Sequence, residues 1–274
     1  MPNMRFVPIN LADVATLTVS SAALPAANMQ DVGRSVVWRS TGKTAEAIYI
    51  LLPSAMALDT VALIRSNLTG TAQWNVHFYS DAAWTTLLDE SGGLTAVPSS
   101  PYTEFGWGYA GLGGDRSFPQ QSVYWRPAST PNVRSIKIDL VDTANPEGYI
   151  EVSRLVVGKR WSPNNNFSYK AKLSFLDQGR QARSEDGTLR SDAGASSRRL
   201  AFNLDWMNDA DRAYFGEIQR YCGLKRDLLA SLYPGDATYF RLAQYTMLAK
   251  FVAPTQMSIE SLARHSAPIE MEES

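Results

Sequence analysis

Residues 135–161, which read SIKIDLVDTANPEGYIEVSRLVVGKRW, decide the fold of this chain. The stretch opens with Ile136, Ile138 and Leu140 on one face of an alternating run, and this period of two predicts a half-buried β-strand. Turn-forming residues fill 142–148, and a second apolar run follows. We therefore expect two strands joined by a turn, which close a first domain.

The second strand of this pair changes phase along its length. Ile150 and Val152 fall on one side of the strand, whereas Leu155 and Val157 fall on the other. One extra residue in a strand shifts the alternation in this way, so the pattern predicts a β-bulge near residues 153–154.

The chain before this pair repeats the strand signal, with turns between the strands. Residues 73–79 alternate cleanly, with Trp74, Val76 and Phe78 on one face. Shorter strand candidates lie at 15–20, 36–38, 47–52 and 61–66. Strands that recur in this way are typical of all-β sandwiches, so the sequence predicts a β-sandwich over residues 10–160.

Composition and charge exclude several classes of protein. The chain has 274 residues, enough for one large or two ordinary domains. Its formal net charge of −1 gives no field that favours nucleic acid or an acidic membrane surface. Cys222 is the single cysteine, so no disulfide forms within the chain. Neither a spanning helix nor a signal peptide is recognisable, so we expect a soluble protein without membrane insertion.

The composition changes after Trp161, and residues 161–254 predict a second domain. Two alternating runs, 168–176 and 200–206, flank a polar segment at 184–199. A helix and further strands follow, which predicts an α+β domain made of an antiparallel sheet with one helix on it.

The helix of this domain has clear end signals. Asn208 suits the N-cap, and Gly223 suits the position just past the C-terminal end. We expect one core to form from the last alternating run and the helix stripe, namely Trp206, Tyr214, Ile218 and Tyr221. Residues 255–274 show little pattern, so we expect a loose tail there.

No group of residues has the pattern of a catalytic or cofactor site. The run 106–111 fits G-x-G-x-x-G, but no helix opens after it, as a dinucleotide site requires. His77 falls in a strand and His265 in the tail, and Cys222 belongs to the apolar helix stripe. We expect no enzyme and no cofactor. A pair of carboxylates of the glycosidase kind stays open, because the chain has 27 acidic residues.

A metal site is weakly indicated at the turn of the central pair. Asp139, Asp142 and Glu147 place oxygen ligands near one loop, as calcium requires. The spacing of a calcium-binding loop is missing, so a solvated turn is the preferred interpretation and we expect no metal.

Several segments together resemble tail proteins of long-tailed bacteriophages. They are TLTVSSA (16–22), VVWRS (36–40), VALIRSNLTGTAQWNVHFYSD (61–81), YIEVSRLVVGKRW (149–161) and GLKRDLLASLYPGD (223–236). The resemblance covers most of residues 10–252. It implies a discoidin or galactose-binding-like jelly roll, followed by a domain similar to the tail-hub and tail-tube sandwich with its flanking helix. The implied fold class is mainly β.

The same resemblance implies a function. The chain would be a structural component of a virion tail, made in the host cytoplasm and assembled as a homo-oligomeric ring at the distal tail tip or baseplate, with other tail proteins as partners. The alternative is a carbohydrate-binding module that contacts host-surface glycans.

Two segments carry the candidate interface or glycan residues. A long Gly-rich segment, 91–130, holds Tyr102, Phe105, Trp107 and Tyr109. Loops of this length usually have a function, and exposed aromatic residues stack on sugars or anchor interfaces; the alternative is that they cap the sandwich core. In the second domain, Arg190, Arg198 and Arg199 are candidates for ion pairs across a subunit boundary.

Overall fold

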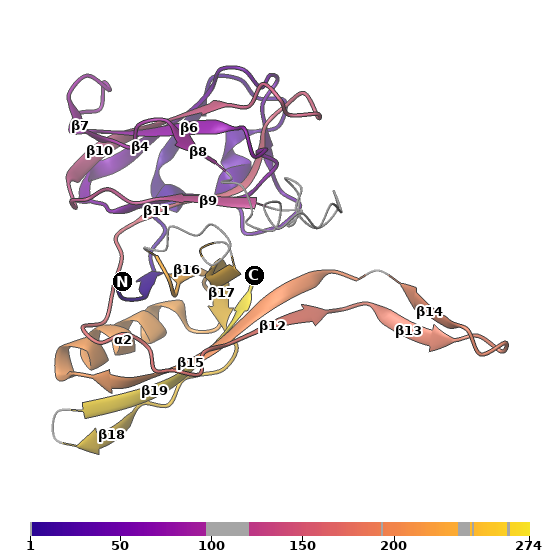
Figure 1. The fold of residues 1–274 in the computed structure, drawn as a ribbon. Helices are drawn as coiled ribbons and strands as arrows, with labels where there is room; N and C mark the ends of the chain where they lie inside the picture. The colour runs from indigo at the N-terminus through magenta and orange to yellow at the C-terminus, as the bar shows by residue number, and fades with distance from the viewer. Residues whose placement is uncertain (1, 97–120, 193, 235–241, 243, 262–263) are drawn as a thin grey trace, which may run out of the picture.

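The computed structural model describes residues 2–96, 121–192, 194–234, 242, 244–261 and 264–274. It is built mainly of β-strands arranged in two stacked bodies, a sandwich and a second body with a curled sheet (Figure 1). A ribbon of two strands projects far from the second body. The predicted fold class is confirmed: a jelly-roll β-sandwich is followed by an antiparallel sheet that carries a helix.

The sandwich consists of two antiparallel sheets. The order of the first is β2 (Thr16–Val19), β4 (Glu46–Ala57), β10 (Asn132–Val141), β6 (Gln73–Tyr79) and β7 (Leu87–Glu90), with β8 (Leu94–Thr95) also paired to β6. The order of the second is β3 (Trp38–Arg39), β11 (Glu151–Gly158), β5 (Thr60–Ser66) and β9 (Gln121–Trp125). Two short 3-10 helices, η1 (Leu11–Val14) and η2 (Ala26–Gln30), contact β11.

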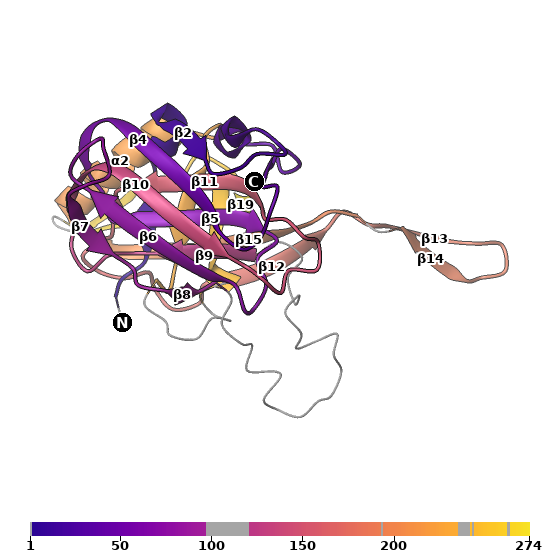
Figure 2. The same ribbon diagram turned by 90° about the horizontal axis from the view of Figure 1, so that it is seen from above.

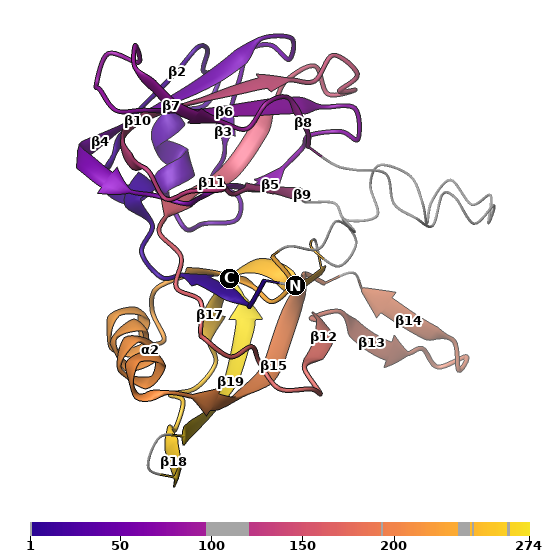
Figure 3. The ribbon, with the colours of Figure 1, turned by 60° about the vertical axis from the view of Figure 1, so that its left-hand side comes forward.

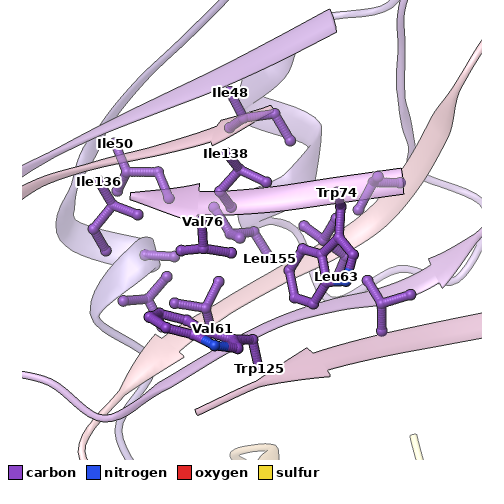
Figure 4. Packing of buried hydrophobic residues seen from close by; sticks show 14 of the residues in the cluster. Ile48, Ile50, Val61, Leu63, Trp74, Val76, Trp125, Ile136, Ile138 and Leu155 are labelled. Carbon is purple, nitrogen blue, oxygen red and sulfur yellow. The ribbon is translucent and has the colours of Figure 1, made fainter. Parts of the chain in front are cut away.

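The core of the sandwich follows from the alternation in its strands. Trp74, Val76 and Phe78 of β6 are buried, as their shared phase predicts. Figure 4 shows Trp74 and Val76 among the aliphatic side chains of β4, β5, β10 and β11. The interdigitation of the two inner faces fixes the register of the strands, because a shift by one residue would expose this whole set.

The stretch 135–161 forms the two central strands, as predicted, but β11 carries no bulge. Its register against β5 runs without a shift from Val152 to Gly158. The phase change itself is real, because Val152 belongs to the same sandwich core as Leu155 and Val157. It falls at Ser153, beside Arg65 of β5, whose φ of 55° is left-handed. Leu155 and Val157 belong to the sandwich core, whereas Val156 packs against the second domain.

The second domain is built around one curled sheet. Its order is β1 (Arg5–Val7), β16 (Leu228–Ser231), β17 (Thr246–Phe251), β19 (Arg264–Glu273), β15 (Ser196–Met207) and β12 (Lys172–Asp177), with β18 (Ser258–Ser261) paired to β19. Edge strand β1 comes from the N-terminus, so the chain enters this domain, builds the sandwich and returns.

The expected loose tail at 255–274 is wrong. Residues 264–273 form β19, which pairs with β15 on one side and β17 on the other. Its inward side chains Ala267, Ile269 and Met271 are buried. Because β19 alternates with Glu residues on its other face, its apolar content is low, and sequence pattern alone does not reveal a central strand.

Helix α2 (Asp209–Cys222) lies on the inner face of this sheet (Figure 1). The side chain of Asn208 accepts a hydrogen bond from the Asp211 N–H, and Gly223 follows the last turn with φ of 51°, so both predicted end signals are confirmed. No helix among the described residues is long and apolar enough to cross a membrane.

The expected core of Trp206 with the helix stripe is only partly right. Ile218 is buried, but Trp206 and Tyr214 are 51% and 66% exposed. The register of β15 against β19 shifts between Leu204 and Met207, so Met207 takes the inward position that alternation gives to Trp206.

The two domains pack sheet against sheet. Ala62, Ile64 and Val156 from the outer face of the sandwich meet Val7, Leu229 and Leu248 from the second domain in one buried cluster. The guanidinium of Arg34, in the sandwich, donates to the backbone oxygens of Ser274 and Glu273 at 2.9 and 3.1 Å. This apolar contact with polar links at its edge holds the domains in one arrangement (Figure 3).

Candidate functional site

The most prominent feature of the surface is an arm that grows out of β12 and β15. These strands pair as far as Asp177 and Ser196, and the ribbon then continues as β13 (Arg180–Arg183) and β14 (Leu189–Asp192). Figures 1 and 2 show from two directions that this ribbon lies clear of both domains. The arm therefore extends the sheet of the second domain into solvent.

The tip of the arm is a well-formed hairpin. Asp186 accepts hydrogen bonds from the Ser184 hydroxyl and the Thr188 N–H, and these bonds lower the pKa of its carboxyl group. Gly187 takes the left-handed conformation (φ 81°) that the turn requires. Local hydrogen bonds thus define the turn, but none of the side chains at this tip is buried.

Every residue of β13 and β14 is exposed. Phe175 and Leu189, on the strands of the arm, are 57% and 49% exposed. A two-stranded ribbon without a packed face is marginally stable in water at best. The arm is therefore a surface suited to rest on another molecule.

The three predicted arginines have different environments. Arg198 donates to Glu273 at 2.7 Å, and Arg199 forms an ion pair with Glu270 at 2.8 Å, so both side chains have a partner within the chain. Burial alone would raise the pKa of Glu273, but the hydrogen bonds to Arg198 and the positive charges of Arg198, Arg65 and Arg34 together lower that pKa. Arg190, in β14, is exposed on the arm.

A second candidate surface lies at one end of the sandwich. Here the carboxylate of Asp142 accepts hydrogen bonds from the Thr69 N–H (2.9 Å), the Thr69 hydroxyl (2.6 Å) and the Asn145 amide (3.2 Å). Asp142 and Asn145 are buried. These bonds tie the loop after β10 to the loop after β5, so that this end of the sandwich is rigid.

An aromatic side chain and several polar groups meet on the rim of this end. The guanidinium of Arg39 lies 4.2 Å from the centre of the Tyr149 ring and donates to Glu151 at 2.6 Å. The Asn67 amide donates to Glu147 at 3.0 Å. A half-buried ring beside a cation, carboxylates and an amide has the chemistry to bind sugar hydroxyls and stack on a sugar face.

Ala96 and Gln121, two described residues of the predicted aromatic segment, lie at this same end. The Ala96 N–H donates to the oxygen of Ala72 at 2.8 Å, and Gln121 pairs with Ser66. Tyr102, Phe105, Trp107 and Tyr109 lie outside the described residues.

The residues weighed for metal binding or catalysis are not brought together. Asp139 contacts His77 at 3.1 Å on the outer face of the sandwich, whereas Asp142 is enclosed by the loops and Glu147 binds Asn67. Cys222 is buried, and burial raises the pKa of its thiol to about 11, which keeps it protonated. In the described part of the chain, no group of three or more potential metal ligands is found.

Comparison with known proteins gives likenesses of the fold only. No protein-family model and no curated protein matches the sequence. Among solved structures, the chitosan-binding module 1 of a chitosanase/glucanase from Paenibacillus sp. IK-5 is 16% identical, with a TM-score of 0.40, over 54% of this chain and 98% of the module. The family 32 carbohydrate-binding module of C. perfringens NanJ, solved with galactose, is 14% identical (TM-score 0.39), over 56% of this chain and 98% of the module. At these scores we draw no function from either.

Sequence reasoning missed the rim of the sandwich end. Arg39 and Tyr149 are 110 positions apart along the sequence, and only the pairing of β3 with β11 brings them together. One signal for this site was present in the sequence. Tyr149 directly follows a turn and precedes a strand, and sandwich folds place binding loops at such positions.

Proposed function

We propose that this chain is a carbohydrate-binding subunit of a larger assembly made of several copies. The arm of the second domain joins one copy to the next, and the free end of the sandwich faces the glycan. The distal tip of a bacteriophage tail is the setting that the sequence resemblance favours. The observation that carries the proposal is the arm, a fully exposed ribbon that finds no packing partner in its own described chain.

The physical argument for assembly rests on conformational entropy. Ordering the backbone of each residue in the ribbon costs about 1–2 kcal/mol of free energy. Exposed side chains bury little apolar surface, so they offset little of that cost. A neighbouring copy supplies the missing burial when Leu189 docks on it. A homo-oligomer needs no second gene product for this, and repeating one contact by rotation closes a ring.

The test is to remove the arm without disturbing its root. Asp177 and Ser196 are directly opposite each other in the ladder, so residues 178–195 can be replaced by Asn-Gly, which suits a two-residue hairpin turn. We expect this variant to melt like the intact chain but to elute as a monomer in light-scattering chromatography, where the intact chain is a defined oligomer.

A point substitution refines this test. Leu189→Ser on the arm is expected to weaken assembly, whereas Leu224→Ser, at a position with nearly the same exposure (50% against 49%), leaves it unchanged. Assembly of the arm-shortened variant into the normal oligomer would show that the arm is not the joint.

Carbohydrate binding is supported by the rim around Tyr149. Tyr149→Ala should weaken binding to glycans on a printed array, and the affinity for the best oligosaccharide should fall by about tenfold, because the stacking face is lost. Tyr221→Ala is the matched control, since Arg226 also stacks on that ring at 4.2 Å. If the two variants bind the oligosaccharide with equal affinity, the rim is not part of the binding site.

A further inference from the structure

A groove lies on the second domain, at the end of β12 and β15 that is farther from the arm, and separate from the sandwich end. Its volume is about 1050 Å³. It is bounded by the segment before β12, by β15, by residues 253–256 after β17, and by Pro268 of β19. Half of its lining residues lie on the strands β12, β15 and β19, which hold that side of the groove in place.

Two aromatic side chains line this groove, and both are largely exposed. Tyr169 is 99% exposed and Trp206 is 51% exposed. The guanidinium of Arg264 lies 3.2 Å from the centre of the Trp206 ring, so one face of the indole is held and orientation is fixed. Lys170, next to Tyr169, has a φ of 81°, a strained conformation of the kind that collects at functional sites.

The polar groups of the groove are unused within the chain. The side chains of Lys172, Asn203 and Gln256 make no hydrogen bond or ion pair with any described residue, and all three are exposed. The Ser168 hydroxyl oxygen is buried and also lacks a partner. The three exposed side chains therefore have donors and acceptors available to a ligand.

We propose that this groove is a second saccharide-binding site, which takes an extended sugar chain. Sugar rings present an apolar face that stacks on Trp206 and Tyr169 and hydroxyl groups that pair with amide and ammonium groups such as those of Asn203, Gln256 and Lys172. Protein interfaces also use Trp and Tyr as anchors. What favours a sugar chain is that the exposed amide and ammonium groups beside the two rings have no partner in the described chain and suit a ligand rich in hydroxyl groups. The site is independent of the rim around Tyr149, because no residue is shared.

The test screens the full chain and its variants on a printed glycan array. The oligosaccharide whose signal depends most on Trp206 is taken as the groove's glycan and is then titrated by calorimetry. Trp206→Ala and Tyr169→Ala should each weaken binding of the groove's glycan by about tenfold. Tyr214→Ala, at an exposed tyrosine on α2, should leave that affinity unchanged. Saturation with this glycan should quench the tryptophan fluorescence of the intact chain and of the other variants, but not that of Trp206→Ala.

Three results would overturn the proposal. One is that no glycan on the array binds in a manner that depends on Trp206. Another is that every glycan that binds is lost in Tyr149→Ala and unaffected in Trp206→Ala, which would leave the sandwich end as the site and keep the proposed function intact. The third is that Trp206→Ala lowers the mass of the oligomer, which would make the groove a contact between copies.

Discussion

Ending the chain after residue 263 is expected to leave the second domain unfolded. The deletion removes β19, which holds β15 and β17 together, and takes Ala267, Ile269 and Met271 out of the core. Two strands would then show unpaired edges, and helix α2 would lose part of the surface that it covers. Near-ultraviolet circular dichroism and limited proteolysis should report the loss of fixed packing for residues 161–261.

The arm-shortened variant is the control for this deletion. It lacks more residues than the C-terminal deletion, yet it should keep the native spectrum, because the missing residues are exposed. A C-terminally shortened chain with native protease resistance would contradict the central position of β19.

Phe6→Ala is expected to lower the free energy of unfolding of the second domain by about 3–5 kcal/mol, the usual loss for a large aromatic residue in a core. Phe6 is fully buried, and its ring lies 5.9 Å from that of Trp161, 6.4 Å from Phe202, and 6.5 Å from both Phe215 and Phe251 (distances between centroids). Truncation leaves a cavity where the N-terminal strand, the linker and the helix meet.

Urea denaturation measures this loss. Phe175→Ala is the matched control, because that ring is 57% exposed on β12 and should change stability by less than about 1 kcal/mol. A loss for Phe6→Ala as small as that of the control would mean that β1 is not part of the folded second domain.

Local pattern was sufficient for the parts of the fold that local chemistry decides. The alternation of Ile136, Ile138 and Leu140 and the cap at Asn208 both lead directly to the observed elements. The position of β1 was beyond such reasoning. It joins β16 across more than 200 positions, and its three residues carry no period of their own.

Tertiary context also decided the positions where pattern failed. Trp206 continues the alternation of β15, and only the pairing with β19 reveals the shift that turns it outward. The phase change in β11 is real, but it occurs without a shift of register against β5. It accompanies the left-handed Arg65 of that neighbouring strand, which the pattern of β11 alone does not reveal.

For the candidate site as well, local pattern predicted one part and missed the part that depends on tertiary contacts. The polar composition of 184–199 indicated an exposed arm, but Arg198 and Arg199 lie at its root, where Glu273 and Glu270 of β19 pair with them. A prediction that treats β19 as a loose tail cannot find these partners. The groove with Tyr169 and Trp206 depends on the same strand and was missed for the same reason.

The central claim is that a second copy orders the arm, and amide hydrogen exchange tests it most directly. Exchange at residues 180–192 is compared with exchange at β15 and β19 over a series of protein concentrations. The arm should exchange rapidly in dilute solution and become protected as the oligomer forms, while β15 and β19 stay protected throughout. Arm amides that are as protected as those of β19 at every concentration, or that stay unprotected in the oligomer, would contradict it.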